Sequence, residues 1–220
     1  MIKIKNLGNK AEIYIHGMIV DDTDANFIDV EHGFVFPAMI REKLDELRGL
    51  PIDVHIASDG GDVAAGVAIY NFLAAHDAPV DVYIDAWAAS IASYIAFVGR
   101  KIYMPANTFV MIHNPAGGGY GTAEYLRSVA DWLDKLKNML AETYTKRMKE
   151  ADLEKIKSLM DAETWFTAEQ VAEMFENVEV LASNENYKAV ACFSEYKTAP
   201  KALKSESLKE HIINVIKGSY

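Results

Sequence analysis

The spacing of apolar residues along the chain switches repeatedly between a period typical of strands and a period typical of helices. Residues 11–16 alternate between apolar and polar positions and are rich in isoleucine, which predicts a strand. Residues 37–48 carry apolar side chains three and four positions apart, which predicts an amphipathic helix. Further strands are predicted over residues 52–57, 80–84, 101–104 and 108–112, and further helices over residues 62–75, about 90–99, 122–149 and 167–175.

Strands that alternate with helices predict an α/β fold around a largely parallel sheet. The helix over residues 122–149 is longer than packing against a small sheet requires. Its apolar side chains recur at intervals of three and four, at Leu126, Val129, Leu133, Leu136, Leu140 and Tyr144. We therefore expect part of this stripe to pack against another subunit.

Composition narrows the class of protein. Half of the 220 residues are apolar, enough for one compact domain, and the net charge of -10 disfavours binding to nucleic acid. The most apolar stretch, residues 82–99, is interrupted by Asp85, so no membrane span is predicted. The single cysteine, Cys192, excludes an internal disulfide, and the amino end shows no secretory leader pattern. We expect a cytoplasmic protein.

The charge is unevenly distributed. Residues 185–220 contain six lysines and four glutamates, which leaves 16 basic and 28 acidic residues in the first 184. We interpret residues 1–184 as one domain and residues 185–220 as a C-terminal extension. In this extension Leu208, Ile212 and Val215 can line one side of an amphipathic helix.

Ser90 stands where a predicted strand gives way, through an alanine-rich turn at residues 86–89, to a predicted helix. The free N–H groups at a helix start favour negative charge, so a serine there can act as a nucleophile beside an oxyanion hole. Taken alone, a serine in this position is more often a simple N-cap. Ser93, three residues later, is interpreted as a small residue that permits close packing.

Three further segments carry groups suited to catalysis. His113 follows an apolar run and can act as a general base, although a structural histidine fits the position equally well. Gly60 and Gly61 follow a predicted strand, where backbone can approach a ligand closely, but glycine pairs are also common in turns. Asp161 and Glu163 lie in a segment between two predicted helices, where most carboxylates are solvated caps.

The sequence predicts neither a metal site nor a cofactor. No pair of histidines or cysteines stands at ligand spacing. No lysine follows the glycines in the register of a phosphate-binding loop.

Four segments, taken together and in order, resemble the Clp peptidase family, and within it the phage and prophage branch associated with head maturation. They span a region from about residue 11 to residue 181. The segments are SDGGDVAAGVAIYN (58–71), DAWAASIAS (85–93), MIHNP (111–115) and MDAETWFTAE (160–169).

The resemblance implies a Clp/crotonase-like spiral of ββα units with a protruding handle helix over residues 122–149, through which rings of subunits stack. It implies that Ser90 is the nucleophile and His113 the base. The backbone N–H groups of Gly60 and Ile91 would form the oxyanion hole.

The third member of the implied triad departs from the family pattern. The position of the usual aspartate falls on Glu163, and Asp161 is the alternate. The resemblance also implies that substrate backbone adds as a strand between Gly61, Asp62 and Val63 on one side and Ala116 and Gly117 on the other. The implied partners are a polypeptide substrate, further copies in a ring, and an ATP-dependent unfoldase unless a phage capsid or scaffold protein is the target.

Two features have no family counterpart. Residues 174–177 stand where the family has a glycine after its last helix, and the extension from residue 185 matches nothing in the family. Two other functions remain open at this level. One is a crotonase-type enzyme acting on acyl thioesters, and the other is a catalytically silent assembly protein.

Overall fold

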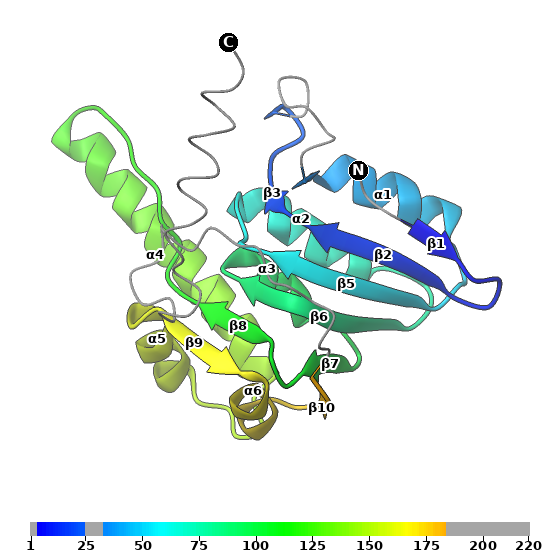
Figure 1. Cartoon of the computed structure of the whole chain (residues 1–220). Coiled ribbons are helices and arrows are strands. Elements are labelled where there is room, and N and C mark those ends of the chain that lie inside the picture. The colour runs from blue at the N-terminus through cyan, green and yellow to red at the C-terminus, as the bar shows by residue number, and fades with distance from the viewer. Residues whose placement is uncertain (1–3, 25–32, 184–220) are drawn as a thin grey trace, which may run out of the picture.

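A central β-sheet organises the chain in the computed structural model, which describes residues 4–24 and 33–183 (Figure 1). Within those residues eight strands form this sheet, and two short strands form a second one. The strands are β1 (Ile4–Asn6), β2 (Ala11–His16), β3 (Met18–Ile19), β4 (Phe34–Val35), β5 (Ile52–Ser58), β6 (Val80–Ala89), β7 (Ile102–Pro105), β8 (Phe109–Ile112), β9 (Thr164–Thr167) and β10 (Val178–Leu181). The helices are α1 (Pro37–Glu46), α2 (Val63–Ala74), α3 (Ile91–Ala96), α4 (Ala123–Lys146), α5 (Leu153–Asp161) and α6 (Ala168–Met174).

The strands of the large sheet are mostly parallel. Its main row runs β1-β2-β5-β6-β7-β10, and within this row only β1 is antiparallel to its neighbour. Strand β6 pairs with β5 along one edge, while its other edge is shared by β7 and then β8. Strand β9 adds antiparallel to β8. The predicted α/β class with a largely parallel sheet is confirmed.

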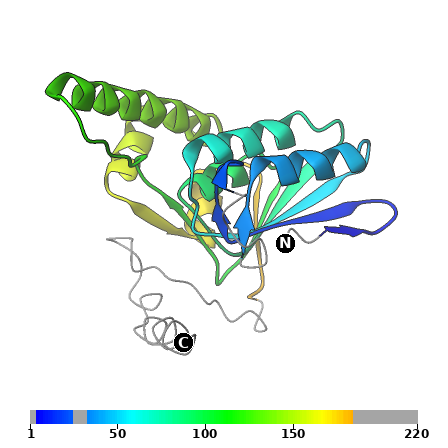
Figure 2. The ribbon, with the colours of Figure 1, turned by 90° about the horizontal axis from the view of Figure 1, so that it is seen from above.

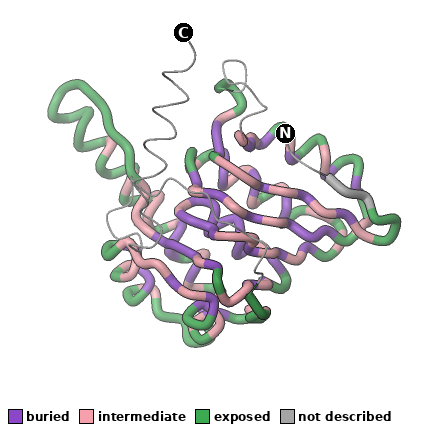
Figure 3. Tube along the Cα trace, in the orientation of Figure 1, coloured by how far each residue is buried: buried purple, intermediate pink, exposed green. Residues whose placement is uncertain are grey.

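The hydrophobic core lies between this sheet and the helices on one of its faces. Figure 2 shows α1 and α2 side by side over that face. Alternate side chains of β2 are fully buried there, which produces the two-residue period seen in the sequence. Ile40 and Leu44 of α1 supply the matching helical stripe. Figure 3 shows the buried positions concentrated in the central strands.

The opposite face of the sheet carries a row of stacked aromatic rings. Successive ring centroids are 4.7, 5.0 and 4.6 Å apart, with interplanar angles of 14° to 18°. Beside the row, the carboxylate of Asp85 lies 2.9 Å from a ring nitrogen of His16 and 2.9 Å from one of His55. The stacked rings are those of Tyr14, His55, Tyr83 and Tyr103. These contacts link four neighbouring strands.

Strand β6 corrects one boundary that the sequence suggested. The strand was expected to end at residue 84 and to be followed by a turn over residues 86–89. Instead, these residues continue β6 to Ala89. The physical reason is pairing, because residues 87–89 lie beside residues 109–111 of β8. Small alanine side chains fit this crowded strand, which is buried at Trp87, Ala88 and Ala89.

The segment between α5 and α6 also differs from expectation. It contains β9, a four-residue strand that was not predicted. Its residues, TWFT, do not alternate between polar and apolar positions, and the strand is defined by its pairing with β8. The predicted C-terminal extension, with its amphipathic helix, lies outside the described residues.

Helix α4 projects beyond the body of the molecule (Figure 1). Its side chains are buried only near its end, at Leu140, Ala141 and Tyr144. Nearer its start, Tyr125, Leu126 and Trp132 are between 45% and 58% exposed. In the apolar stripe of α4, Leu126 is exposed and the next three members are only partly buried. The single chain therefore leaves the first part of this stripe incompletely covered.

Gly66 offers a test of how tightly α2 packs on α3. A Cβ atom at Gly66 would lie 2.2 Å from Ile91 Cγ1, which is far inside van der Waals contact. We expect Gly66→Ala to lower the free energy of unfolding by about 1–3 kcal/mol through overpacking. Guanidinium denaturation would measure this change. Gly118→Ala is the matched control, since a Cβ there meets nothing within 4 Å; equal midpoints for the two variants would contradict the expected clash.

Candidate active site

Ser90 occupies a strained turn between β6 and α3. Its backbone has φ 55° and ψ -130°, a region that non-glycine residues rarely adopt and that often marks a functional position. The turn is held by the Ser90 N–H, which donates to the carbonyl of Met111 in β8 at 3.0 Å. The Ser90 side chain makes no capping hydrogen bond. The simple N-cap interpretation of Ser90 is therefore excluded by the geometry.

The hydroxyl of Ser90 instead meets an imidazole. Its Oγ lies 2.7 Å from Nε2 of His113, the residue that directly follows β8. The parallel pairing of β6 and β8 explains this contact. Ala89 lies beside Met111, so the residue that follows β6 and the residue that follows β8 both lie at the same edge of the sheet.

Glu163 lies opposite His113 by strand register. Strand β9 runs antiparallel to β8 with Thr164 beside Ile112, so the residue before Thr164 faces the residue after Ile112. Burial lowers the pKa of His113, and the negative charge of Glu163 acts in the opposite direction and raises it. Glu163 itself has φ 49°, a second left-handed backbone position in the site.

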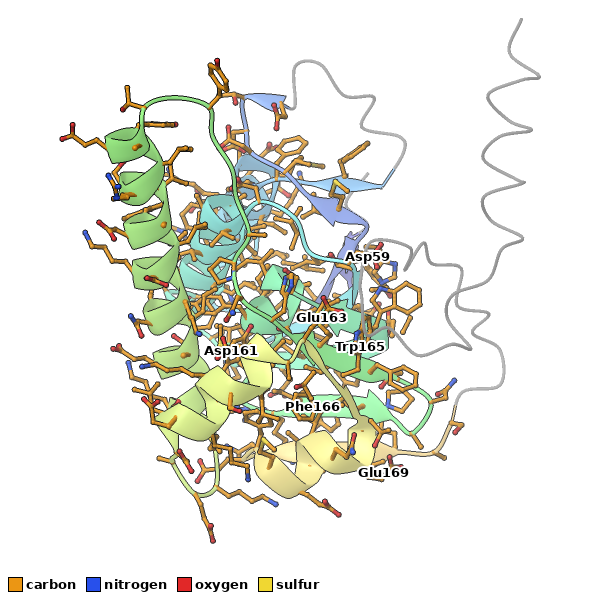
Figure 4. The ribbon with its side chains drawn as sticks, turned by 90° about the vertical axis from the view of Figure 1, so that its left-hand side faces the viewer. Asp59, Asp161, Glu163, Trp165, Phe166 and Glu169 are labelled. Atoms are coloured by element: carbon orange, nitrogen blue, oxygen red, sulfur yellow. The ribbon has the colours of Figure 1, made fainter. Side chains whose placement is uncertain are left out.

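Asp161 has different partners. Its carboxylate accepts a hydrogen bond from Lys137 of α4 and another, at 2.8 Å, from Nδ2 of Asn114. These two contacts, that of Lys137 first, lower the pKa of Asp161. Figure 4 shows Asp161 on the side of α4 and Glu163 nearer the sheet. The structure thus brings Glu163 to His113 and directs Asp161 to the handle helix.

Gly60 packs directly against the turn that carries Ser90. A Cβ atom at Gly60 would lie 2.8 Å from Ser90 Cβ and 3.1 Å from the backbone nitrogen of Ile91, and its φ is +94°. Only glycine fits this close approach. The preceding residue helps to hold the turn, because Trp87 Nε1 donates to Asp59 Oδ1 at 2.7 Å.

The two glycines differ in the partners of their N–H groups. The Gly60 N–H donates to Ser58 Oγ at 3.1 Å, and that hydroxyl donates to the carbonyl of Gly17. Gly61 lies beside Ile19 in a parallel bridge. The hydrogen bonds of this bridge run from the Ile19 N–H to the Gly60 carbonyl and from the Asp62 N–H to the Ile19 carbonyl. The Gly61 N–H therefore points to the other side of this extended segment. Within residues 4–24 and 33–183 the Gly61 N–H meets no acceptor. Sequence reasoning assigned Gly61 to substrate binding alone.

The other predicted substrate-binding residues lie on the segments that follow Gly61 and His113. The Asp62 side chain caps α2 by accepting from the Ala65 N–H at 2.7 Å. Its backbone N–H donates to the Ile19 carbonyl at 2.9 Å, and its carbonyl accepts from the Gly66 N–H at 3.0 Å. Val63 begins α2. Ala116 and Gly117 follow His113 in an exposed stretch without helix or strand, and a Cβ at Gly117 would lie 3.4 Å from Leu133 of α4.

Asn114 and Lys137 were missed by sequence reasoning. Both bind Asp161, and together they connect the segment after His113, the end of α5 and the handle helix. Asn114 could have been suspected from its place beside His113, but nothing in the sequence pairs Lys137 with a residue 24 positions away.

In the described part of the chain, no group of three or more His, Cys, Asp or Glu side chains is arranged to hold a metal ion. In the same residues, no helix is both long enough and apolar enough to cross a bilayer.

Comparison with solved structures identifies the fold. A point mutant of ClpP1 from Listeria monocytogenes superposes with a TM-score of 0.64 at 20% identity, covering 79% of this chain and 92% of that one. The expected Clp/crotonase-like architecture is confirmed.

Sequence comparison identifies the family. The family model for Clp protease matches residues 41–174. The ATP-dependent Clp protease proteolytic subunit 2 of Thermobifida fusca (strain YX) is 32% identical over 166 residues, which are 74% of this chain and 77% of that protein. The chain therefore belongs to the Clp protease family, a family of peptidases.

The arrangement of carboxylates around His113 predicts a difference between two isosteric variants. Glu163→Gln removes the negative charge that raises the pKa of His113, so this pKa should fall further below its ordinary value. Asp161→Asn should leave it nearly unchanged, because that carboxylate is held by Lys137 and Asn114. Histidine-selective NMR titration, assigned with His113→Gln, would measure both. A larger fall in Asp161→Asn than in Glu163→Gln would contradict the assignment of Glu163.

Proposed function

We propose that the protein is a serine endopeptidase with Ser90 as the nucleophile and His113 as the general base. The observation that carries the proposal is the 2.7 Å contact between Ser90 Oγ and His113 Nε2. A nucleophile within hydrogen-bond reach of its base is the defining geometry of this mechanism. Membership of the Clp protease family supports peptide bonds as the substrate.

In the proposed reaction, His113 Nε2 accepts the Ser90 proton while Oγ bonds to the carbonyl carbon of the peptide. The carbonyl oxygen becomes an oxyanion. When the intermediate collapses, the C–N bond breaks and the proton on Nε2 passes to the leaving amine. Water then hydrolyses the acyl ester with the same imidazole as base, which restores the serine. The lowered pKa of His113 keeps its imidazole neutral and ready to accept a proton at neutral pH.

The Ile91 N–H, at the start of α3, is one proposed donor to the oxyanion. The second donor comes from the glycine pair. Gly60 was expected to supply it, but its N–H already donates to Ser58 Oγ. The Gly61 N–H has no such partner in the described residues and is the better candidate on this ground. Gly60 packs against the Ser90 turn and Gly61 directly follows Gly60, so either donor leaves the mechanism unchanged.

We assign Glu163 as the third member of the triad. It faces His113 across the β8–β9 pair and its charge stabilises a protonated imidazole. We assign Asp161 a structural role, since its hydrogen bonds hold Asn114 and Lys137 in place.

Substrate backbone is proposed to add as an extended strand beside Gly61, whose carbonyl faces the side away from Ile19 while its N–H serves the oxyanion. The exposed segment at Ala116 and Gly117 would pair with its other edge. Recognition through backbone atoms suits a peptidase that acts on many sequences.

We propose that copies of the chain assemble into rings that pack through α4. The support is the uncovered apolar surface of this helix, in which Leu126 is 45% and Trp132 is 58% exposed. The Thermobifida fusca relative is named as an ATP-dependent proteolytic subunit. That name favours an ATP-driven unfoldase as the supplier of polypeptide over the phage head-maturation role.

Covalent labelling tests the nucleophile. A fluorophosphonate probe should label the wild-type protein at Ser90, located by peptide mass spectrometry, and Ser90→Ala should not be labelled. Peptidase activity should fall by at least about 1,000-fold in Ser90→Ala. Ser128→Ala, which removes an exposed hydroxyl on α4, is the control and should behave as wild type. Turnover of an acyl thioester that survives Ser90→Ala would instead favour the crotonase-type function.

Sedimentation velocity tests the assembly surface. Leu126→Glu places a charge at the exposed start of the apolar stripe and should shift the protein from its oligomer to a smaller species. Asn138→Glu introduces the same charge at an exposed position of α4 outside that stripe and should not. A wild-type protein that sediments as a monomer at micromolar concentration would contradict a ring packed through α4.

A further inference from the structure

Two hydroxyl groups are buried directly behind the Ser90 turn. Ser93 of α3 is completely buried, and Tyr144 of α4 is 2% exposed. Ser93 Oγ lies 2.6 Å from the carbonyl oxygen of Ser90 and 2.8 Å from the hydroxyl oxygen of Tyr144. Ser93 is thus more than the small packing residue expected from sequence, because its hydroxyl links the handle helix to the backbone of the candidate nucleophile.

The direction of this link follows from counting protons. The Ser90 carbonyl oxygen can only accept, so Ser93 donates its single hydroxyl proton to it. The Tyr144 hydroxyl must then be the donor to Ser93 Oγ. Burial raises the pKa of Tyr144 far above its ordinary value, so the phenol keeps its proton throughout the neutral range.

The Ser90 carbonyl matters because it belongs to the same peptide unit as the Ile91 N–H. A trans peptide is planar, so its carbonyl and its N–H point in opposite directions. The Ser90 carbonyl also accepts from the Ser93 N–H at 2.9 Å, which gives it two donors from one residue. Holding this oxygen on the buried side therefore aims the Ile91 N–H away from the core, toward the side on which Gly60 packs. Hydrogen bonds in series also polarise the peptide and strengthen its N–H as a donor.

Packing alone does not require either hydroxyl. The Tyr144 ring makes edge contacts with Tyr94 and Phe97, with centroids 6.2 and 5.5 Å apart, and a phenylalanine would keep both. The two hydroxyls are buried polar groups in the contact between α3 and α4. Tyr144 donates to Ser93, and Ser93 donates to the carbonyl of the strained residue Ser90, so the two hydroxyls form one chain that ends at this carbonyl.

We propose that Ser93 and Tyr144 are positioning residues that aim and polarise the Ile91 N–H for stabilisation of the oxyanion. The inference rests on the proposed serine peptidase function. It assigns to the buried end of α4 a role in the chemical step that is separate from the role of its exposed end in assembly.

Labelling kinetics with a rhodamine fluorophosphonate test this role in the full-length protein, because the phosphonyl oxygen of the adduct takes the place of the oxyanion. Ser93→Ala should lower the limiting first-order labelling rate by about 10-fold or more, as expected when an oxyanion donor is misaligned. Tyr144→Phe, which leaves Ser93 in place, should lower it by roughly 3-fold. The half-saturating probe concentration should not change. The double variant should match Ser93→Ala alone, since Tyr144 acts through Ser93.

Tyr94→Phe is the matched control. It removes the hydroxyl of another buried tyrosine in the same cluster, which accepts a long hydrogen bond of 3.4 Å from Thr143 Oγ1, and it should label at the wild-type rate. The pH midpoint of labelling should be the same in every variant, because the pKa of His113 is set by its burial and by the charge of Glu163, which none of them changes. A midpoint that moves with the rate would show general loosening of the site and overturn the inference.

The outcomes separate this inference from the proposed function. Wild-type limiting rates in both Ser93→Ala and Tyr144→Phe would overturn the positioning role and leave the serine peptidase intact. A wild-type protein that is not labelled at Ser90 would overturn both. Because the limiting rate is first order, it does not depend on the amount of folded protein, and if Ser93→Ala fails to fold by circular dichroism, Tyr144→Phe decides alone.

Discussion

The parallel pairing of β6 with β8 is the constraint on which the rest of the site depends. Ser90 and His113 are 23 positions apart, and neither side chain has any reason to meet the other in an unfolded chain. The ladder that places Ala89 beside Met111 brings the residue after the end of each strand to one edge of the sheet. The antiparallel addition of β9 then brings Glu163 to the same edge. Three strands thus create a reactive group that no single segment contains.

Strain at Ser90 is sustained by what surrounds it. A left-handed backbone at a serine carries an energetic cost, and it persists only where neighbouring contacts determine the conformation. Here the Ser90 N–H is bound to β8, its carbonyl is bound to Ser93, and Gly60 packs against its Cβ atom. The turn is therefore fixed from three sides, while its hydroxyl remains directed at an imidazole. Rigid support of a strained residue is a common way to prepare a site before substrate arrives.

The sequence was most informative where a periodic pattern or an ordered set of motifs was available. Strand β2 and helix α1 were predictable from their spacing, and Ser90 and His113 were singled out by four segments in family order. Elements that are defined only by their pairing were not predictable in this way. The continuation of β6 to Ala89 and the existence of β9 both depend on pairing with β8, which is a property of the folded chain. The same limit applies to side chains: the contacts of Tyr144 with Ser93 and of Lys137 with Asp161 join residues that no local pattern connects.

The division of one edge of β6 between β7 and β8 has a consequence for how the chain tolerates change. Side chains alternate between the two faces of a strand, so a slip of β8 by one residue along β6 would turn every β8 side chain to the wrong face and carry the imidazole with it. Insertions within the four residues of β8 are thus far more damaging than insertions in the exposed glycine-rich stretch that follows. Variation in loop length should accumulate beyond residue 115, where it alters the surroundings of the reactive pair without disturbing its alignment.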